Sequence, residues 1–160
     1  MNLKNGNTSN KGFTLIELVV VIGILSILLA IVLIAINPAR QFKQANDTKR
    51  RSDVGALINA IGQYAAENKG KLPSDINTTV KHIASAATGA DLCGTTNGQT
   101  DKVSPTYISA LPQDPLSNNG APITDCTGYD TGYTVVVDSN GRVTVSAPST
   151  EIPPTISVTR

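Results

Sequence analysis

The chain has 160 residues, which suffice for one ordinary domain with an appendage but not for a multidomain enzyme. Its 13 Lys+Arg nearly balance 12 Asp+Glu, so the net charge of +1 gives no argument for a nucleic-acid or acidic ligand. One His and two Cys are too few for a Cys/His zinc site within this chain. Aromatic residues make up 4% and Trp is absent, so a globular part must build its core from aliphatic side chains and Ala.

One segment departs sharply from this average composition. From Leu18 to Ile36 there are 19 residues, of which 15 are Leu, Ile or Val. As a helix rising ~1.5 Å per residue, this run is ~29 Å long, which matches the hydrocarbon thickness of a bilayer. A helix that is apolar on every face needs either a membrane or a large protein around it, and the rest of the chain is small and polar. We therefore expect the run to insert into a membrane rather than to form a buried core helix.

The residues before the run indicate which kind of membrane segment it is. Residues 1–12 are polar, carry only Lys4 and Lys11 as charges and end in Gly12. An ordinary secretory signal places small residues after its apolar stretch, where it is cleaved. Here the small residue comes first, so cleavage after Gly12 removes a basic leader and leaves the apolar segment at the new N-terminus.

The stretch from Lys11 to Leu18, KGFTLIEL, resembles the class III signal of type IV pilins and of the pseudopilins of type II secretion. It combines a basic residue, Gly before the cut, Phe after it, an acid as fifth mature residue and a following apolar span. The resemblance implies that a prepilin peptidase removes the leader, residues 1–12, between Gly12 and Phe13. It also implies N-methylation of Phe13 and assembly of residues 13–38, the transmembrane helix, into the core of a filament.

Glu17 has a physical argument of its own. An unpaired carboxylate at the start of a membrane helix is costly, so an acid at this place is a candidate functional residue. Cleavage creates a cationic amine on Phe13, and N-methylation keeps that charge. The N-terminus of a neighbouring subunit is then a partner for Glu17, and one such pair penalises every wrong axial register. The alternative is an acid whose side chain only reaches the bilayer edge.

Residues 39–70 are expected to form the amphipathic second half of the helix. Apolar residues recur there at helical spacing, which predicts one face docked on a globular head. These residues are Val54, Leu57, Ile58, Ile61, Tyr64 and Ala65. Asn37-Pro38 interrupts the pattern and predicts a kink or local melting, because Pro lacks a backbone donor. Gly70 and Pro73 predict the end of the helix.

A cluster of charged residues follows the apolar run, with five cations offset by one acid. Its members are Arg40, Lys43, Asp47, Lys49, Arg50 and Arg51. We interpret the cluster as a solvated helix face, with lipid headgroups or a neighbouring subunit as alternative contacts. The five cations exceed the two of the leader, so the positive-inside rule alone places the C-terminal part in the cytoplasm. The resemblance implies the opposite orientation, with a cytoplasmic leader and an extracytoplasmic head.

Residues 71–147 predict a small globular α+β head. A short helix is expected to begin near Ser74 or Thr78 and to end at Gly89. Its apolar positions are Ile76, Val80, Ile83 and Ala87. Residues 88–104 are rich in Gly, Thr, Asn and Asp and predict a loop.

Two motifs organise the rest of the head. Tyr107-Ile108 followed by Leu-Pro-Gln-Asp-Pro at 111–115 is similar to a segment of major pseudopilins that connects the helical half to the sheet. Residues 133–137 and 142–146 are β-branched runs that flank Asp-Ser-Asn-Gly, and Asn-Gly favours a tight primed turn. Together with the helix they predict a pilin-like α+β fold, in which a long N-terminal helix packs on three or four antiparallel strands. The tail, residues 148–160, is expected to be flexible unless its stretch from Ile156 to Val158 adds a strand.

Cys93 and Cys126 lie 33 residues apart in loop-like surroundings. An even pair in a chain expected to leave the cytoplasm predicts a disulfide, worth ~3 to 4 kcal/mol by loop-closure entropy. Such a bond resembles the cysteine-bounded loop of many type IV pilins. Two reduced thiols are the alternative, because a bond needs the two Cα atoms to lie roughly 6 Å apart, which a sequence does not reveal.

No catalytic constellation is present in the sequence, so we predict no catalytic residue and no enzymatic activity. His82 has no serine or cysteine motif to serve and is interpreted as a surface residue. Major pseudopilins, which the chain resembles, have a calcium-binding loop in their C-terminal half. Four carboxylates of this chain are candidates for the oxygen ligands of such a loop: Asp114, Asp125, Asp130 and Asp138. Their spacing matches no calcium loop, so we predict no cofactor and assign no metal ligands, with calcium as the alternative.

The resulting functional hypothesis is a structural subunit, pilin or pseudopilin, of a membrane-assembled filament that serves pilus formation or type II protein secretion. The expected partners are further copies of the chain, the membrane, a prepilin peptidase, an assembly ATPase and an inner-membrane platform protein. Neither a small-molecule substrate nor nucleic acid is expected. The expected location is the cytoplasmic membrane, as a single-pass protein with an extracytoplasmic head, and a periplasmic or extracellular filament after assembly. The alternative is a membrane-anchored extracytoplasmic binding domain that does not polymerise.

Overall fold

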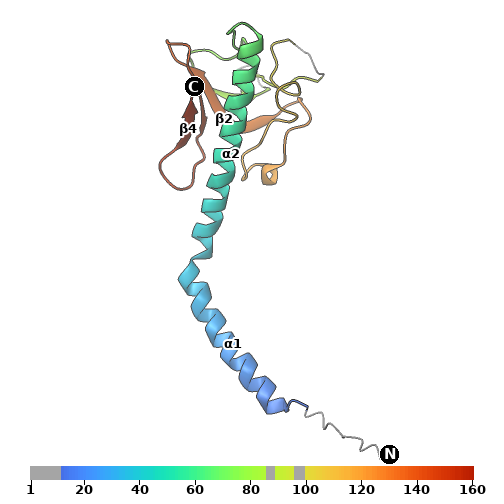
Figure 1. Ribbon diagram of the computed structural model, residues 1–160, viewed down its shortest axis with the longest axis vertical. Coiled ribbons are helices and arrows are strands. Elements are labelled where there is room, and N and C mark those ends of the chain that lie inside the picture. Colours follow the sequence, from blue (N-terminus) through green and yellow to red (C-terminus); the bar gives the residue numbers. More distant parts are fainter. Residues whose placement is uncertain (1–11, 86–88, 96–99) are drawn as a thin grey trace, which may run out of the picture. The chain divides into compact units, whose positions relative to one another are not determined.

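The computed structural model describes residues 12–85, 89–95 and 100–160. The chain divides into two compact units, Met1–Gln41 and Phe42–Arg160. The first unit holds helix α1 (Leu15–Ile36), and the second holds most of helix α2 (Pro38–Glu67) with a sheet and its loops (Figure 1). A long apolar helix combined with an antiparallel sheet is the α+β arrangement of a pilin-like fold, which confirms the predicted fold class.

Local chemistry explains both boundaries of α1. Thr14 is extended, and its side chain accepts a hydrogen bond from the backbone N–H of Glu17, which caps the N-terminus. Asn37, at the other end, adopts a left-handed φ of 43°, which Asn tolerates better than most residues. Pro38 begins α2, where its missing N–H leaves no hydrogen bond unmade. The interruption expected at Asn37-Pro38 is therefore confirmed, as a break between two helices.

α2 supplies one side of the core of the head, residues 42–160. Its buried apolar residues form the stripe that a helix needs to pack on a sheet. They are Val54, Leu57, Ile58, Ala60, Ile61 and Tyr64. After Glu67 the chain turns away through Gly70, whose φ is 81° and whose N–H donates to the carbonyl of Ala65 at 2.8 Å. The stop signal expected at Gly70 is confirmed.

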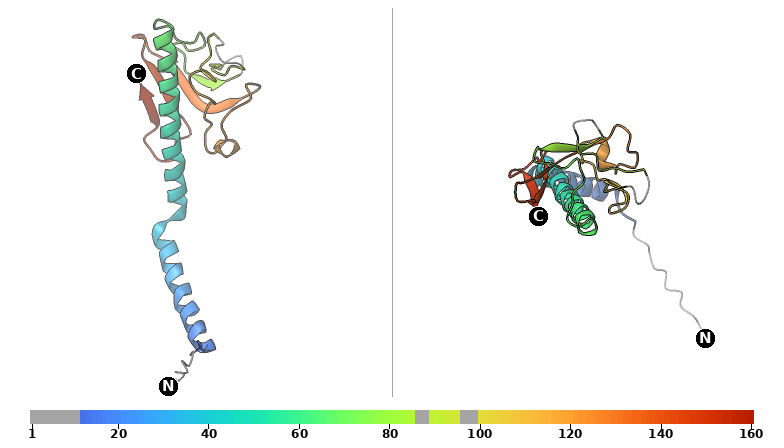
Figure 2. Two further views of the ribbon diagram at one scale, coloured as in Figure 1. Left: turned by 45° about the vertical axis from the view of Figure 1, so that its right-hand side comes forward. Right: turned by 90° about the horizontal axis from the view of Figure 1, so that it is seen from above.

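Four strands form one antiparallel sheet in the order β1-β2-β3-β4. They are β1 (Lys81–Ala84), β2 (Asp130–Val137), β3 (Val143–Ala147) and β4 (Ile156–Thr159). Alternate residues of β2 and β3 are buried, because successive side chains of a strand point to opposite faces. Tyr133, Val135 and Val145 belong to this inward set and join the apolar residues of α2 in one core. Figure 1 and the left-hand view of Figure 2 show α2 running across the sheet.

The prediction of a short helix between Ser74 and Gly89 is wrong, because strand β1 lies in the centre of this segment. β1 pairs with β2 at Lys81↔Val135 and His82↔Thr134. Ile83 is fully buried, whereas Val80, assigned to the same apolar face in the sequence, is 63% exposed. Ala87, the last of the expected helical positions, lies outside the described residues. Pairing with β2 therefore outweighed a weak helical periodicity.

The hairpin between β2 and β3 is confirmed, but its turn is not the primed one expected. Among the four loop residues only Gly141 has a positive φ, 81°, whereas a primed turn on Asn-Gly requires one at Asn140 too. The backbone N–H of Gly141 donates to the carbonyl of Asp138 at 3.0 Å. The Asp138 carboxylate accepts hydrogen bonds from the N–H groups of Asn140 and Arg142 at 2.8 and 2.9 Å. This side chain thus stabilises an unprimed turn that Gly141 closes.

The C-terminal segment is also more ordered than its composition predicts. Residues 148–160 were expected to be flexible unless Ile156 to Val158 added a strand, and β4 is that strand. It pairs with β3 from Ala147↔Ile156 to Thr144↔Thr159. The stated exception therefore applies to residues 156–159, where pairing with β3 joins the segment to a strand that precedes it in the sequence.

Candidate functional site: the start of α1 and the charged anchor of the head

The start of α1 brings Glu17 and Thr14 together. The backbone N–H and the hydroxyl of Thr14 both donate to Oε2 of Glu17 at 2.8 Å. The backbone N–H of Glu17 donates to the Thr14 hydroxyl at 3.3 Å, which completes a reciprocal capping box. The carboxylate therefore has local donors and lies at the positive end of the helix dipole. A role for Glu17 is predicted from the sequence, whereas the contribution of Thr14 was missed, although Thr three residues before Glu is the sequence signature of this box.

The bond expected to be cleaved is accessible. Gly12, Phe13 and Thr14 precede the first residue of α1 and are exposed, with Phe13 at 91%. A peptidase needs its substrate backbone outside regular hydrogen-bonded structure, and the Gly12–Phe13 bond meets this condition. The leader residues Lys4 and Lys11 lie outside the described residues.

The surface of α1 is aliphatic on every side. None of its residues is buried, and the 15 Leu, Ile and Val side chains between Leu18 and Ile36 are 46% to 84% exposed. The helix is long and apolar enough to cross a membrane. Its hydroxyl at Ser26 donates to the carbonyl of Ile22 at 2.7 Å, so this polar group makes its hydrogen bond within the helix. Such a surface requires lipid or other apolar helices around it.

The head contains a buried cation, Arg50, which the sequence predicts to lie on a solvated helix face. Its side chain is fully buried on α2, and Nε and Nη2 donate to the two carboxylate oxygens of Asp114 at 2.7 and 2.9 Å. Nη1 donates to Asp47 at 2.9 Å and to Glu151 at 3.3 Å. Three carboxylates from separate parts of the chain therefore surround one guanidinium. The expectation of a solvated cluster is wrong for Arg50, because these partners replace the water that the charge loses on burial.

Asp47 extends this anchor to the C-terminal segment. Its carboxylate accepts the backbone N–H groups of Glu151 and Ile152 at 3.0 and 2.8 Å. The side chain of Asn46 donates to Glu151 at 2.7 Å. The loop before β4 is thus fixed on the first turns of α2 by backbone and side-chain bonds together.

Asp114 comes from the Leu-Pro-Gln-Asp-Pro motif at 111–115, so this motif ties α2 to the sheet. The N–H of Asp114 donates to the carbonyl of Thr131 on β2 at 2.9 Å, while its carboxylate holds Arg50. Leu111 is fully buried in the core. The resemblance implies that this motif connects the helical half to the sheet, and the bonds of Asp114 to Thr131 and Arg50 make that connection.

Hydrogen bonds favour the charged forms of these groups against the effect of burial. Burial alone raises the pKa of Asp114, but hydrogen bonds from Arg50 and from the N–H of Leu116 outweigh it and hold the pKa below its ordinary value. Burial likewise opposes the lowering of the pKa of Asp47, which follows from the N–H of Glu151 and from Arg50. The hydrogen bond with Asp114 raises the pKa of Arg50 further above its already high value, against the effect of burial.

The other basic residues of the cluster have different surroundings. Lys49 forms an ion pair with Asp53 at 2.8 Å and also donates to the carbonyl of Gln113 at 3.3 Å. Arg40, Lys43 and Arg51 are exposed, as expected for a solvated face.

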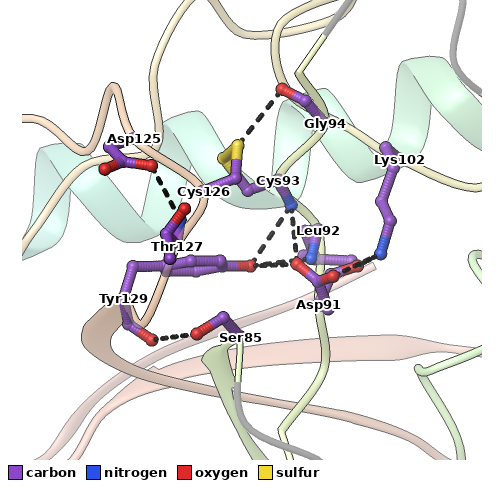
Figure 3. Close-up of a disulfide and its surroundings, with 10 residues drawn as sticks. All are labelled: Ser85, Asp91, Leu92, Cys93, Gly94, Lys102, Asp125, Cys126, Thr127 and Tyr129. Atoms are coloured by element: carbon purple, nitrogen blue, oxygen red, sulfur yellow. Dashed lines mark hydrogen bonds and ion pairs between the residues drawn. A yellow bond between two sulfur atoms is a disulfide. The ribbon is translucent and has the colours of Figure 1, made fainter.

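Cys93 and Cys126 form a disulfide, with Cα atoms 5.4 Å apart (Figure 3). Tyr129 supports the bond from below: its hydroxyl accepts the N–H groups of Leu92 and Cys93 at 3.0 and 3.2 Å and donates to Asp91 at 2.8 Å. Burial, and then the hydrogen bond to Asp91, raise the pKa of Tyr129. The expected disulfide is confirmed, and the alternative of two reduced thiols does not apply to this structure.

The remaining candidate ligands are dispersed. Asp114 is engaged by Arg50, Asp130 lies 3.5 Å from His82, and Asp138 binds its own hairpin turn. Within residues 12–85, 89–95 and 100–160, no group of three or more His, Cys, Asp or Glu is arranged to hold a metal ion. His82 has an exposed side chain, consistent with its interpretation as a surface residue.

Comparison with known proteins bears on the start of the chain. A family model described as the prokaryotic N-terminal methylation motif matches residues 7–33. The match covers the leader's end, the expected cleavage site and most of α1. Neither the search of curated proteins nor the search of solved structures gave a match.

Proposed function

We propose that this chain, a precursor carrying the class III signal found in type IV pilins and pseudopilins, is the structural subunit of a membrane-assembled filament of a pilus or type II secretion system. The observation that carries the proposal is the continuity of the methylation motif with α1, of which no residue is buried. In the membrane, lipid covers this helix. In a filament, the helices of other subunits take the place of the lipid.

The first step is processing at the exposed Gly12–Phe13 bond. Hydrolysis consumes one water, leaves a carboxylate on Gly12 and creates an amine on Phe13, and a methyl donor then replaces one N–H of that amine by N–CH₃. A secondary amine stays protonated near neutral pH, so the methylated N-terminus keeps its positive charge. The methyl group removes one strongly hydrated N–H and suits an apolar environment.

The second step is alignment through Glu17. In the single subunit its carboxylate is satisfied by Thr14 within the capping box. In the filament the new N-terminal cation of a neighbouring copy adds an ionic partner. A charge pair between apolar helices contributes little net stability but makes every other axial register costly, because each wrong register leaves both charges unpaired.

The partners follow from these steps. A prepilin peptidase cleaves and methylates the chain, while an assembly ATPase and an inner-membrane platform protein extract subunits from the bilayer. The head remains outside the cytoplasm, where the disulfide between Cys93 and Cys126 is stable.

The proposal is tested by N-terminal sequencing of membrane-extracted protein together with a Glu17→Gln variant. We expect the wild type to begin at methylated Phe13, and the variant to be processed but to give no sheared filaments. Ser26→Ala is a matched control in the same helix, because the Ser26 hydroxyl bonds only to the carbonyl of Ile22 among the described residues. A chain that still begins at Met1, or filaments equally abundant in both variants, contradicts the proposal and favours an anchored binding domain.

A further inference from the structure

We propose that the heads of neighbouring copies associate through an ion pair between Arg51 of one copy and Asp125 of the next. This inference rests on the proposed filament function and adds the surface through which the heads recognise one another. Two unpartnered charges, one on each side of α2, carry it.

Arg51 differs from the two basic residues before it. Lys49 is paired with Asp53, and Arg50 is enclosed by carboxylates, but Arg51 is exposed and has no ionic partner among the described residues. Two hollows of about 380 and 320 Å³ adjoin it, bounded by Ile152 in one case and by residues 154–158 in the other. A side chain from another molecule can therefore reach the guanidinium from either flank.

Asp125 is the matching acid. Three acids of the described head lack a cation partner, namely Glu67, Asp101 and Asp125. The first two accept hydrogen bonds from other segments, from Tyr107 and Ser74 respectively. Among the described residues, Asp125 bonds only to Thr127, two residues away, at 2.9 Å. The carboxylate is exposed, and the adjoining disulfide at Cys126 holds it in place (Figure 3).

The two charges lie on opposite sides of the head. In Figures 1 and 2 the dark red C-terminal loop that borders Arg51 lies on one side of α2, and the yellow and orange loops between Leu111 and Asp130 lie on the other. A contact between two different patches of one molecule is heterologous, so each copy offers a free patch to a further copy. Where the rotation between copies does not close a ring, repetition of such a contact generates an open helical assembly, which is the symmetry a filament needs.

An ion pair between Arg51 and Asp125 suits the recognition of a partner more than it adds to the free energy of association. A guanidinium presents parallel N–H donors that match the two oxygens of a carboxylate, which fixes the orientation of the partner. An exposed pair of this kind contributes little stability, but like charges in the same position repel. Disruption should therefore appear as impaired assembly of an intact subunit.

The first experiment exchanges the charges in the full chain, produced in cells that carry the assembly machinery. We expect Arg51→Glu or Asp125→Arg alone to lower the amount of sheared filament by about fivefold or more. The double variant Arg51→Glu/Asp125→Arg should restore it, because the pair is rebuilt with reversed polarity. Lys71→Glu is the control: Lys71 is exposed and outside the proposed pair, so Asp125→Arg should not rescue any defect that it causes.

The second experiment detects the contact directly. A zero-length carbodiimide joins a carboxylate to an amine only when the two touch, so an Arg51→Lys variant should give cross-linked subunits through Asp125. The cross-linked peptide should be identified by mass spectrometry and be missing from the Arg51→Lys/Asp125→Asn variant.

The outcomes separate this inference from the function on which it rests. Single variants that assemble at wild-type level, a double variant that stays defective, or an unchanged cross-link pattern overturn the Arg51–Asp125 contact while wild-type filaments still form. An intact disulfide and normal processing in each variant show that the head is folded. If the wild type forms no filament, the proposed function itself fails.

Discussion

Helices α1 and α2 follow one another with only Asn37 between them, yet they differ in which side chains are buried: α1 exposes its apolar side chains, whereas α2 buries charged ones. α1 exposes 17 large aliphatic side chains and buries none of its residues. α2 buries Asp47 and Arg50, at 1% and 0% exposure, alongside its apolar stripe. In water, each arrangement would be costly if nothing compensated it.

The difference shows what compensates each helix. An aliphatic surface needs only a surrounding of the same polarity, which lipid or other helices provide without specific geometry. A buried guanidinium only donates hydrogen bonds, so it needs acceptors at defined distances, and these must come from the same head. We therefore expect changes in α1 to act on membrane insertion and assembly, and changes in the charged anchor to act on the stability of the head.

The largest expected effect is on Arg50. Arg50→Met leaves the carboxylates of Asp47 and Asp114 buried without a cation and should destabilise the head by about 3–5 kcal/mol. Arg51→Met removes the same charge one residue later, at an exposed position, and should stay within about 0.5 kcal/mol of the wild type. Thermal unfolding of the full chain in detergent, followed by near-UV circular dichroism of its Tyr residues, measures both. Equal midpoints for the two variants would contradict the anchor.

Removal of the disulfide comes next. Cys93→Ser/Cys126→Ser frees a loop of 33 residues and should cost the head about 3–4 kcal/mol through loop-closure entropy. The cleavage site and α1 belong to the other compact unit of the chain, so the double variant should insert into the membrane and be cleaved like the wild type. The same unfolding assay, combined with N-terminal sequencing, separates the two readouts. A processing defect as large as the loss of stability would show that the two units are not independent.

A charge placed in the middle of α1 should cost a comparable free energy, but in membrane insertion and not in the unfolding of the head. Leu25→Lys makes insertion less favourable by about 3 kcal/mol, which the other aliphatic residues still outweigh. Carbonate extraction should therefore find the variant in the membrane, while its head should unfold at the wild-type temperature, since Leu25 is 57% exposed and is not one of the core residues of the head. Leu25→Ile is the control for the side chain alone. A lower unfolding temperature in the lysine variant would place Leu25 in contact with the head.

A fall in pH should have the smallest effect of the four changes, and we expect it on the free energy of unfolding of the head. The pKa values of Asp47 and Asp114 are lowered in the folded chain, so the unfolded chain takes up protons on these groups at a higher pH than the folded chain does. Their contribution to the free energy of unfolding is complete above the ordinary Asp pKa of about 4 and is lost as pH falls through the lower folded values. Unfolding midpoints measured from about pH 5 to about pH 2 should fall less steeply for Asp114→Asn than for the wild type. Identical slopes in the two proteins would show that protonation of Asp114 does not contribute to the loss of stability in acid.

Several local features of the head were readable in the sequence, and others were not. The stripe of α2 and the runs of the β2–β3 hairpin repeat with the periods of a helix and a strand, so their burial follows from spacing. Residues 81–84 carried a weak helical period as well, and only the presence of β2 beside them decided for a strand. Asn140-Gly141 predicted a primed turn because residue preferences are averages, whereas the carboxylate of Asp138 selected another turn in this loop.

The sequence by itself determined the N-terminal part: the motif around Gly12 and Phe13, the acid at Glu17 and the length of the apolar helix. These features are local, since each depends on neighbours within one or two helical turns. Only the tertiary structure decided that Arg50 is buried and Arg51 exposed, because two of the three carboxylate partners of Arg50, Asp114 and Glu151, lie 64 and 101 residues away in the chain. Two adjacent basic residues look alike in a sequence, and the folded head distinguishes them by bringing carboxylates to one of them.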